Sequence, residues 1–218
     1  MTAPAWLAAL ARDAPGLDIP PALRPPAAAS GRRSAVLLLF GERAGEPDLL
    51  IVSRSPALRR HAGQAAFPGG VIEPGDDGPA AAALREAAEE VGVDPAGVDV
   101  AGLLPELFLA FSGFRVVPVL AWWRRPAADG PGDGEITAAA RVPLRQLADP
   151  ANRVALRHRS GLIGPAFRLP GLLVWGFTGA LVDRVLALGG WERPWDTGRF
   201  EELPLAAVAA QGDAAPPA

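Results

Sequence analysis

The sequence predicts an α/β fold in which helices cover both faces of a mixed β-sheet. Three observations lead to this prediction. Short apolar runs of strand length are separated by turn residues rich in Gly, Pro and Asp. Helical patterns occur before and after these runs instead of alternating with them one for one. Half of the 218 residues are hydrophobic, which is ample for the core of one domain with appended ends.

The two ends of the chain differ in composition from the middle. Residues 1–33 are predicted to be a leader with a short helix at 5–11 and a proline-rich stretch at 20–26, packed loosely on the domain. Residues 34–205 are predicted to form the main domain. Residues 206–218 are rich in Ala and Pro, which predicts a disordered tail because few side chains there can join a core.

The main domain is expected to open with an antiparallel hairpin, since two apolar runs at 34–40 and 48–52 flank a turn at 41–47. Further strands and helices are predicted after this hairpin. Strands are expected at 98–104, 114–122, 136–142 and 166–173, a loop at 126–134, a helical turn at 144–148 and a helix at 175–188. The stretch 156–162 has no clear pattern.

One helix has a readable beginning and end. Pro79 suits the first helical position, and the acids just before it lie near the positive end of the helix dipole. Apolar residues follow at helical spacing up to Val91. Gly92 fits a left-handed cap, and Asp94-Pro95 cannot continue the helix. The helix is therefore expected at 79–91.

Three carboxylates fall within five residues near the end of this helix: Glu86, Glu89 and Glu90. Residues three and four apart share a helix face, so these side chains should project together. Carboxylate oxygens are ligands that suit Mg²⁺ or Mn²⁺. An acidic helix face in contact with water would need no function. The flanking residues are therefore needed to decide between a metal site and a solvated face. Upstream, Gly69 and Gly70 are expected in a loop, where they allow a close backbone approach that a side chain would block.

Composition excludes several other classes of protein. A formal charge of −3 and a pI near 5.5 give no bulk attraction to nucleic acid or to anionic membranes. The absence of cysteine removes disulfides and thiolate sites and fits a cytoplasmic location. No secretory signal is apparent, and the most apolar stretch, 171–182, is too short to span a membrane.

The stretch from Gly70 to Val93 resembles the Nudix box, G-x5-E-x7-R-E-U-x-E-E-x-G-U, where U is aliphatic. Its second half matches at Arg85, Glu86, Glu89, Glu90 and Gly92. Its first half differs, because the spacing from Gly70 to Arg85 is one residue longer. The early Glu of the box is replaced by Asp76 or Asp77, depending on where the extra residue lies.

The residues upstream of the box resemble the additional motif of the coenzyme A diphosphatase branch of this family, approximately L-L-T-x-R-S-x3-R-x3-G-x3-F-P-G-G. Matching positions are Arg54, Ser55, Arg59, Gly63 and Phe67 through Gly70, whereas Val52 stands where the motif has Thr. Guanidinium groups bind phosphate oxygens in a fixed fork, so Arg54 and Arg59 are the first candidates for phosphate contacts. Ser55 is a candidate phosphate ligand or an ordinary turn serine.

The resemblance implies a Nudix-type α/β/α sandwich with a mixed sheet over residues 34–205. It implies metal-dependent hydrolysis of coenzyme A or acyl-coenzyme A to 3′,5′-ADP and 4′-phosphopantetheine. Metal ligands are expected at Glu86 and Glu90, with Glu89 as a third ligand or a base. Arg85 is expected to orient a glutamate, and Glu135 is a candidate general base. Gly69 and Gly70 would lie against the substrate.

Two rivals remain open at this level. One is a Nudix hydrolase of another nucleoside diphosphate, such as ADP-ribose or a dinucleotide. The other is a non-catalytic Nudix-fold ligand sensor, which would be expected to have lost its metal glutamates. The sequence does not choose between Mg²⁺ and Mn²⁺. Homodimers are frequent in the family, but no stripe of residues in this sequence indicates whether the chain has a dimer interface.

Overall fold

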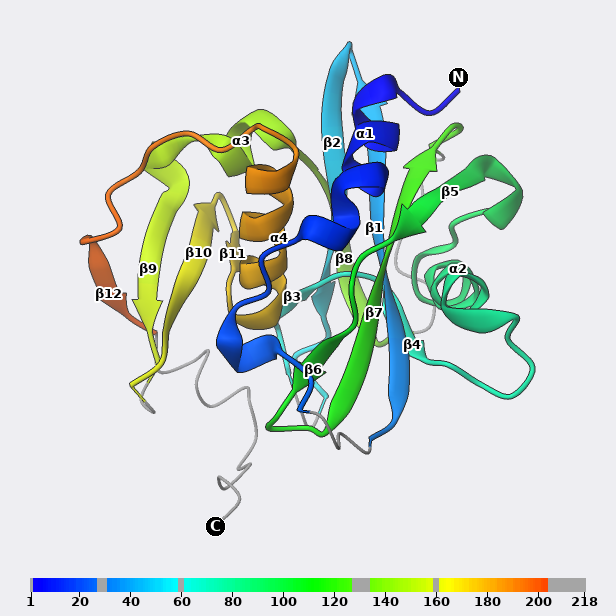
Figure 1. The fold of residues 1–218 in the computed structure, drawn as a ribbon, viewed down its shortest axis with the longest axis horizontal. Coiled ribbons are helices and arrows are strands. Elements are labelled where there is room, and N and C mark those ends of the chain that lie inside the picture. The colour runs from blue at the N-terminus through cyan, green and yellow to red at the C-terminus, as the bar shows by residue number, and fades with distance from the viewer. Residues whose placement is uncertain (1, 27–30, 59–60, 127–133, 159–160, 204–218) are drawn as a thin grey trace.

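The computed structural model describes residues 2–26, 31–58, 61–126, 134–158 and 161–203 (Figure 1). Within these residues the strands form two sheets. The larger sheet contains β1 (Arg33–Arg43), β2 (Glu46–Arg54), β3 (Ala65–Ala66), β4 (Gly69–Val71), β5 (Val98–Leu103), β6 (Leu107–Leu109), β7 (Phe114–Trp123) and β8 (Ile136–Pro143). The smaller sheet contains β9 (Arg153–Arg157), β10 (Ile163–Leu169), β11 (Leu172–Val174) and β12 (Phe200–Glu202). The α-helices are α1 (Ala5–Asp13), α2 (Gly78–Val91), α3 (Leu144–Ala148) and α4 (Gly176–Leu188).

The larger sheet is mixed, as predicted, and on one edge of β1 the partner strand changes along its length. Its main path runs β3–β2–β1–β7–β5, with β1 and β7 parallel and β1 and β2 antiparallel. β7 pairs with β1 from Arg33 to Phe40 and so occupies one edge of that strand. On the other edge, β2 pairs with β1 from Phe40 onward, whereas β4 pairs with it only from Ser34 to Val36. β4 therefore enters where β2 has left β1.

Alternation along β1 divides the core into two layers. Ala35, Leu37 and Leu39 belong to the cluster that packs against α2. Leu38 and Phe40 belong to the cluster that contains residues of α1 and α4. Successive side chains of a strand point to opposite faces, so this division places helices on both faces of the sheet, as predicted (Figure 1).

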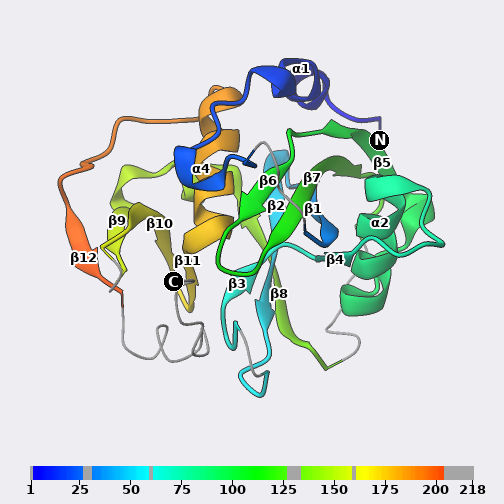
Figure 2. The ribbon, with the colours of Figure 1, turned by 60° about the horizontal axis from the view of Figure 1, so that its bottom comes forward.

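The smaller sheet corrects the prediction of one strand at 166–173. The structure has a hairpin there, in which β10 and β11 pair from Phe167↔Val174 to Leu169↔Leu172. The turn contains Gly171 at φ 70, a left-handed conformation that favours glycine. α4 lies between the smaller sheet and the larger one (Figure 2). Its residues share a cluster with residues of both sheets, so the two sheets are joined by one core.

A buried ion pair fixes β9 to α4. Arg153 has no exposed side-chain surface, and its guanidinium donates a hydrogen bond to Asp183 and lies 3.6 Å from a carboxylate oxygen of Glu192. The guanidinium also lies 4.5 Å from the ring centroid of Trp195. Burial lowers the pKa of Arg153 from its ordinary value, and Asp183 and Glu192 oppose that shift. The charge is therefore held in the interior by its two acidic partners.

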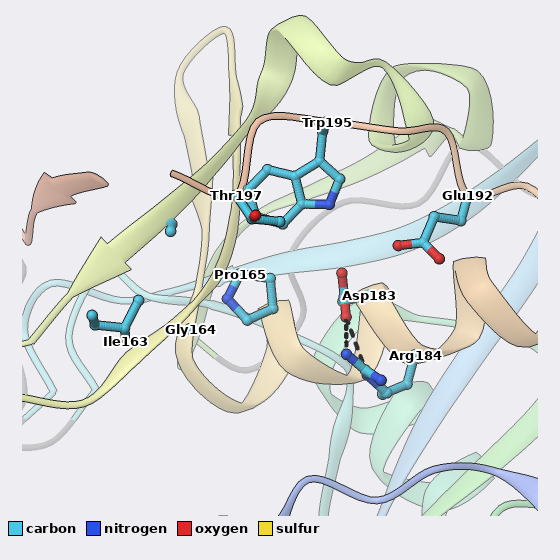
Figure 3. Close-up of a pocket in the computed structure, with 9 residues that line it drawn as sticks. Ile163, Gly164, Pro165, Asp183, Arg184, Glu192, Trp195 and Thr197 are labelled. Atoms are coloured by element: carbon cyan, nitrogen blue, oxygen red, sulfur yellow. Dashed lines mark hydrogen bonds and ion pairs between the residues drawn. The ribbon is translucent and has the colours of Figure 1, made fainter. Parts of the chain in front are cut away.

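A cavity of about 280 Å³ opens beside this ion pair (Figure 3). Trp195 and Glu192 lie on one side of it, and Asp183 with its ion-pair partner Arg184 lies on the other, on α4. None of the residues predicted to act in catalysis or binding lines this cavity. It is therefore separate from the predicted site on α2.

The N-terminal helix is packed more tightly than the sequence predicts. Leu7 and Leu10 on α1 are 0% and 2% exposed, and they join the larger core cluster. Trp6 makes edge-to-face contacts with Phe40 and Trp122, at 5.4 and 6.1 Å between ring centroids. The expectation of loose packing is wrong because the apolar face of this helix covers one face of the sheet.

Three predictions made from the sequence concern residues outside the described part of the chain. These are the position of Arg59, the disordered tail at 206–218 and most of the loop at 126–134. The domain limits at 33 and 205 stay predictions. No helix among the described residues is long and apolar enough to cross a membrane.

Candidate functional site

The predicted helix is α2, and its small residues bring it close to β1 and β4. Ala82, Ala83 and Ala87 are fully buried under the sheet. The helix ends at Gly92, whose φ of 70 is left-handed and whose N–H donates to the carbonyl of Ala88 at 3.0 Å. The cap stops the helix about one turn after Glu89 and less than two turns after Glu86, so the last two turns of α2 carry the glutamates.

Glu90 points inward from α2 and meets β4. It is 4% exposed, and its Oε2 accepts a hydrogen bond from the N–H of Gly69 at 3.0 Å. Its Oε1 lies 4.0 Å from the guanidinium of Arg54. The sequence predicts a loop at Gly69 and Gly70, but these residues form a short strand, because they pair with Val36 and Ala35 of β1. Because β4 is paired with β1, the N–H of Gly69 is held in position to donate to Glu90.

Both glycines of β4 allow a contact that a side chain would prevent. A Cβ on Gly69 would lie 2.3 Å from the carbonyl oxygen of Ala35, so β4 could not pair so closely with β1. A Cβ on Gly70 would lie 2.3 Å from Oε1 of Glu86 and 2.4 Å from its Cδ. Glu86 therefore lies directly over the bare backbone of Gly70. Burial there raises the pKa of Glu86, and Arg85 opposes the shift.

We expect Gly70→Ala to lower kcat by about 100-fold, because the new methyl group must displace the Glu86 carboxylate by roughly 1 Å. The control is Gly75→Ala, which changes a glycine with no atom within 4 Å of its added Cβ. Steady-state kinetics and thermal unfolding of both variants give the comparison. Equal activity in the two variants would show that the Glu86–Gly70 contact does not matter for turnover.

Arg85 joins the helix to the preceding loop. Its Nε and Nη2 donate to the two carboxylate oxygens of Asp76, each at 3.0 Å, and Nη2 also donates to the carbonyl of Val71 at 3.1 Å. Its Nη1 donates to Glu86 at 3.0 Å and to Glu89 at 3.3 Å. These contacts are those of a residue that orients glutamates.

The same contacts decide between Asp76 and Asp77. The side chain of Asp76 is 7% exposed and holds Arg85 with both oxygens, whereas Asp77 makes no capping hydrogen bond at the start of α2. Asp76 thus stands in the position of the early acid, and the extra residue falls between Asp76 and Arg85. Counting six residues on from Gly70 also reaches Asp76, a signal that was available in the sequence.

The hydrogen bonds from Arg85 lower the pKa of Asp76 below its usual value. A carboxyl whose pKa is lower in the folded state stabilises the fold above its unfolded pKa, and this contribution is lost as the pH falls through the folded pKa. We therefore expect Asp76→Asn to be less stable than the wild type at pH 7, with the difference shrinking as the pH falls below about 4. Urea unfolding across this range measures it. A difference that does not change with pH would contradict the assigned pKa shift.

Glu89 and Glu135 lie at the more exposed margin of the site. Their side chains are 56% and 52% exposed. Glu89 contacts Arg85, and Glu135, the residue just before β8, forms an ion pair of 3.0 Å with Arg54. Arg54 therefore lies between Glu135 and Glu90, and it links the start of β8 to the helix. The base assignments of Glu89 and Glu135 stay predictions.

The upstream motif meets the helix through β2. Arg54 is the last residue of β2, and its Nε is buried without a hydrogen-bond partner within the described part of the chain. Ser55 is 8% exposed, and its Oγ accepts a hydrogen bond from the N–H of Ala57 at 3.3 Å, as in an ordinary serine turn. Arg59 lies outside the described residues.

The carboxylates suit a hard divalent cation in their chemistry, because each offers oxygen ligands and Glu86 and Glu90 flank the glycine strand. Among the residues that the structure describes, no group of three or more acidic or histidine side chains is close enough to hold an ion. Two arginine side chains contact the glutamates in this arrangement. Arg85 forms ion pairs with Glu86 and Glu89, and Arg54 lies near Glu90. Glu86 and Glu90 are the residues that fit a metal best.

Comparison with known proteins agrees with this geometry. A family model for the NUDIX domain matches residues 31–161. Uncharacterized Nudix hydrolases called NudL resemble the chain: that of Cronobacter sakazakii is 37% identical over 166 residues, which cover 75% of this chain and 85% of that protein. That of Pectobacterium atrosepticum is 36% identical over 185 residues, 82% of this chain and 92% of that protein.

A solved structure shows the same fold. The Nudix hydrolase RenU from M. smegmatis matches with a TM-score of 0.53 and 21% identity, covering 77% of this chain and 91% of that one. The α/β architecture, the glutamates on α2 and these matches lead to one conclusion. The chain belongs to the Nudix hydrolase family, and its enzymatic class is that of a diphosphatase.

Proposed function

We propose that this protein hydrolyses the diphosphate bond of coenzyme A or acyl-coenzyme A in the presence of Mg²⁺ or Mn²⁺. The products would be 3′,5′-ADP and 4′-phosphopantetheine or its acyl form. One observation carries the proposal: Arg54, from the motif typical of the coenzyme A branch, lies between Glu90 of the Nudix box and Glu135. The two motifs therefore meet in one site.

In the proposed mechanism, Glu86 and Glu90 would hold the cation, with Glu89 as a further ligand or a base. When bound, the cation neutralises charge on the phosphate oxygens and lowers the pKa of water. Arg85 acts by position, since its contacts with Glu86 and Asp76 fix the direction of the Glu86 carboxylate.

The residues at the substrate side have separate roles. Arg54 would bind a phosphate oxygen after exchanging its contact with Glu135, because one guanidinium can serve either carboxylate or phosphate. Glu135, released by that exchange, would accept a proton from the attacking water. The backbone of Gly69 and Gly70 would let a phosphate approach closely.

The rivals differ from this proposal in specific residues. A Nudix hydrolase of ADP-ribose or a dinucleotide would have no need of the motif from Arg54 to Gly70. A ligand sensor would have no need of buried Glu90 or of the bare backbone under Glu86. A small-molecule nucleotide as partner also agrees with the acidic pI, near 5.5, which does not favour nucleic acid or membranes. A cytoplasmic location and a homodimer stay predictions.

The test is a product assay by mass spectrometry with coenzyme A, acetyl-coenzyme A, ADP-ribose and a diadenosine polyphosphate, each with Mg²⁺ and with Mn²⁺. We expect coenzyme A and acetyl-coenzyme A to have the highest kcat/KM of the four substrates and to give 3′,5′-ADP and phosphopantetheine products. A higher kcat/KM for ADP-ribose or the dinucleotide would assign the chain to the first rival. No turnover of any substrate, with binding retained, would favour the sensor.

Arg59→Ala is expected to raise KM for coenzyme A by about tenfold and that for ADP-ribose much less, because coenzyme A carries an additional 3′-phosphate. Arg12→Ala is the control, since the Arg12 side chain is 71% exposed on α1. The measurement is KM for both substrates in both variants. Equal effects on the two substrates would refute the role of Arg59 in specificity.

A further inference from the structure

We propose that His61 and Phe111 form a stacking site for the adenine base of the substrate. This inference rests on the proposed function in one respect, because it takes the substrate to be an adenine nucleotide diphosphate. Neither residue belongs to the predicted catalytic set. Two connections of the larger sheet carry them: His61 lies between β2 and β3, and Phe111 lies between β6 and β7. Both connections lie at the same end of the sheet (Figure 2).

Phe111 presents a large aromatic ring to solvent from a well-fixed turn. It is 56% exposed, so much of this residue is open to a ligand. The N–H groups of Ser112 and Gly113 both donate to the carbonyl of Leu109, at 3.1 and 2.8 Å. Gly113 has a φ of 69, which closes the turn in a left-handed conformation. The turn therefore holds the ring outward.

His61 is held beside that ring in a strained conformation. Its φ is 57, a left-handed value that is costly for a residue with a Cβ. Its Nδ1 lies 2.9 Å from Oε1 of Gln64, and its ring centroid lies 5.8 Å from that of Phe111 at an angle of 58°. Backbone strain of this kind persists only where the surroundings impose it, and it clusters at ligand-binding positions.

Backbone hydrogen bonds tie this pair of rings to the candidate active site. The N–H of Arg54 donates to the carbonyl of Gln64, and the N–H of Gly63 donates to the carbonyl of Arg54, each at 3.0 Å. His61 is three residues from Gln64, so its Cα lies within roughly 10 Å of that of Gln64 even if the chain between them is fully extended. Arg54 in turn contacts Glu135 and Glu90. His61 therefore lies on a segment that is hydrogen-bonded to Arg54, the residue proposed to bind a phosphate, and Phe111 contacts His61.

The chemistry of the pair fits a nucleobase better than the other parts of the proposed substrate. Flat aromatic faces stack on bases, and this contact is worth about tenfold or more in affinity per base. A flexible pantetheine arm offers no flat surface, and a phosphate would need cations instead of a phenyl ring. The exposed phenyl ring and the imidazole together provide the aromatic surface that an adenine ring requires.

The test measures binding by calorimetry in the presence of Mg²⁺, with two ligands that differ only in the base: 5′-AMP and ribose 5-phosphate. We expect Phe111→Ala to weaken the binding of 5′-AMP by about tenfold and to leave the binding of ribose 5-phosphate unchanged. Phe111→Trp should restore the affinity. The matched control is Phe200→Ala, since Phe200 is also exposed, at 49%, but lies in the smaller sheet. Circular dichroism checks that each variant is folded.

Three results would overturn the proposal. They are unchanged affinity of Phe111→Ala for 5′-AMP, an equal loss for both ligands, and a wild type that binds 5′-AMP no better than ribose 5-phosphate. Failure of the proposed function gives a different result. If coenzyme A is not cleaved but the base-dependent loss occurs in Phe111→Ala and not in Phe200→Ala, the stacking site stands and the substrate is another adenine nucleotide.

Discussion

Glu90→Gln is expected to lower kcat by about 1,000-fold, because a cation contributes several kcal/mol to the stability of the transition state and loses a charged ligand in this variant. The fold should be unaffected. The amide oxygen of Gln can still accept the hydrogen bond that Glu90 receives from the N–H of Gly69 at 3.0 Å. The substitution thus removes the charge and keeps the packing of a residue that is 4% exposed.

Two measurements are needed for this variant, since activity alone does not distinguish the loss of a metal ligand from a local distortion. Binding of Mn²⁺, followed by electron paramagnetic resonance, should weaken along with kcat. Glu42→Gln on the exposed end of β1 is the control with the same change of charge. Unchanged kcat and unchanged Mn²⁺ affinity in Glu90→Gln would refute the assignment of Glu90 as a metal ligand.

Asp183→Asn is expected to lower the free energy of unfolding by about 3 kcal/mol, because it leaves the guanidinium of Arg153 buried with less compensation. Arg153 has no exposed side-chain surface, and Glu192, at 3.6 Å, remains as a weaker partner. The expected loss is therefore at the lower end for a broken buried ion pair. Urea unfolding at pH 7 measures it.

A double variant shows whether the ion pair is the cause. Arg153→Met with Asp183→Leu removes both charges and keeps apolar volume, so much of the lost stability should return. Asp196→Asn, an exposed aspartate in the segment before β12, should change the stability little. If the double variant is as unstable as Asp183→Asn, the loss comes from packing and not from an uncompensated charge.

The sequence predicts the elements whose signals are local. α2 is found within one residue because Pro79, Gly92 and Asp94-Pro95 mark its ends. The hairpin of β1 and β2 is found too, but it is longer than expected, since its charged ends, Glu42, Arg43 and Glu46, still pair across the turn. Two predictions fail because they depend on distant partners: β4 is a strand only because β1 pairs with it, and α1 is buried only because the sheet offers an apolar face.

The same distinction applies to the candidate site. The motif gives the contacts of Arg85 with Glu86 and Glu89, because their spacing places them close together on one helix, whereas Glu90 turns inward to β4. It does not give the ion pair between Arg54 and Glu135, which lie 81 residues apart in the sequence. It also gives no sign that Phe111 contacts His61, since aromatic residues far apart in sequence reveal no contact by their spacing.

The burial of α1 has a consequence for anyone who shortens this chain. The match to the family covers residues 31–161 and so omits both α1 and α4. A protein trimmed to those limits would leave Phe40 and Trp122, now 0% and 2% exposed, without the helices that cover them. Such a fragment would expose a broad apolar surface and aggregate. The practical minimum for expression therefore begins before Trp6 and extends past Leu188.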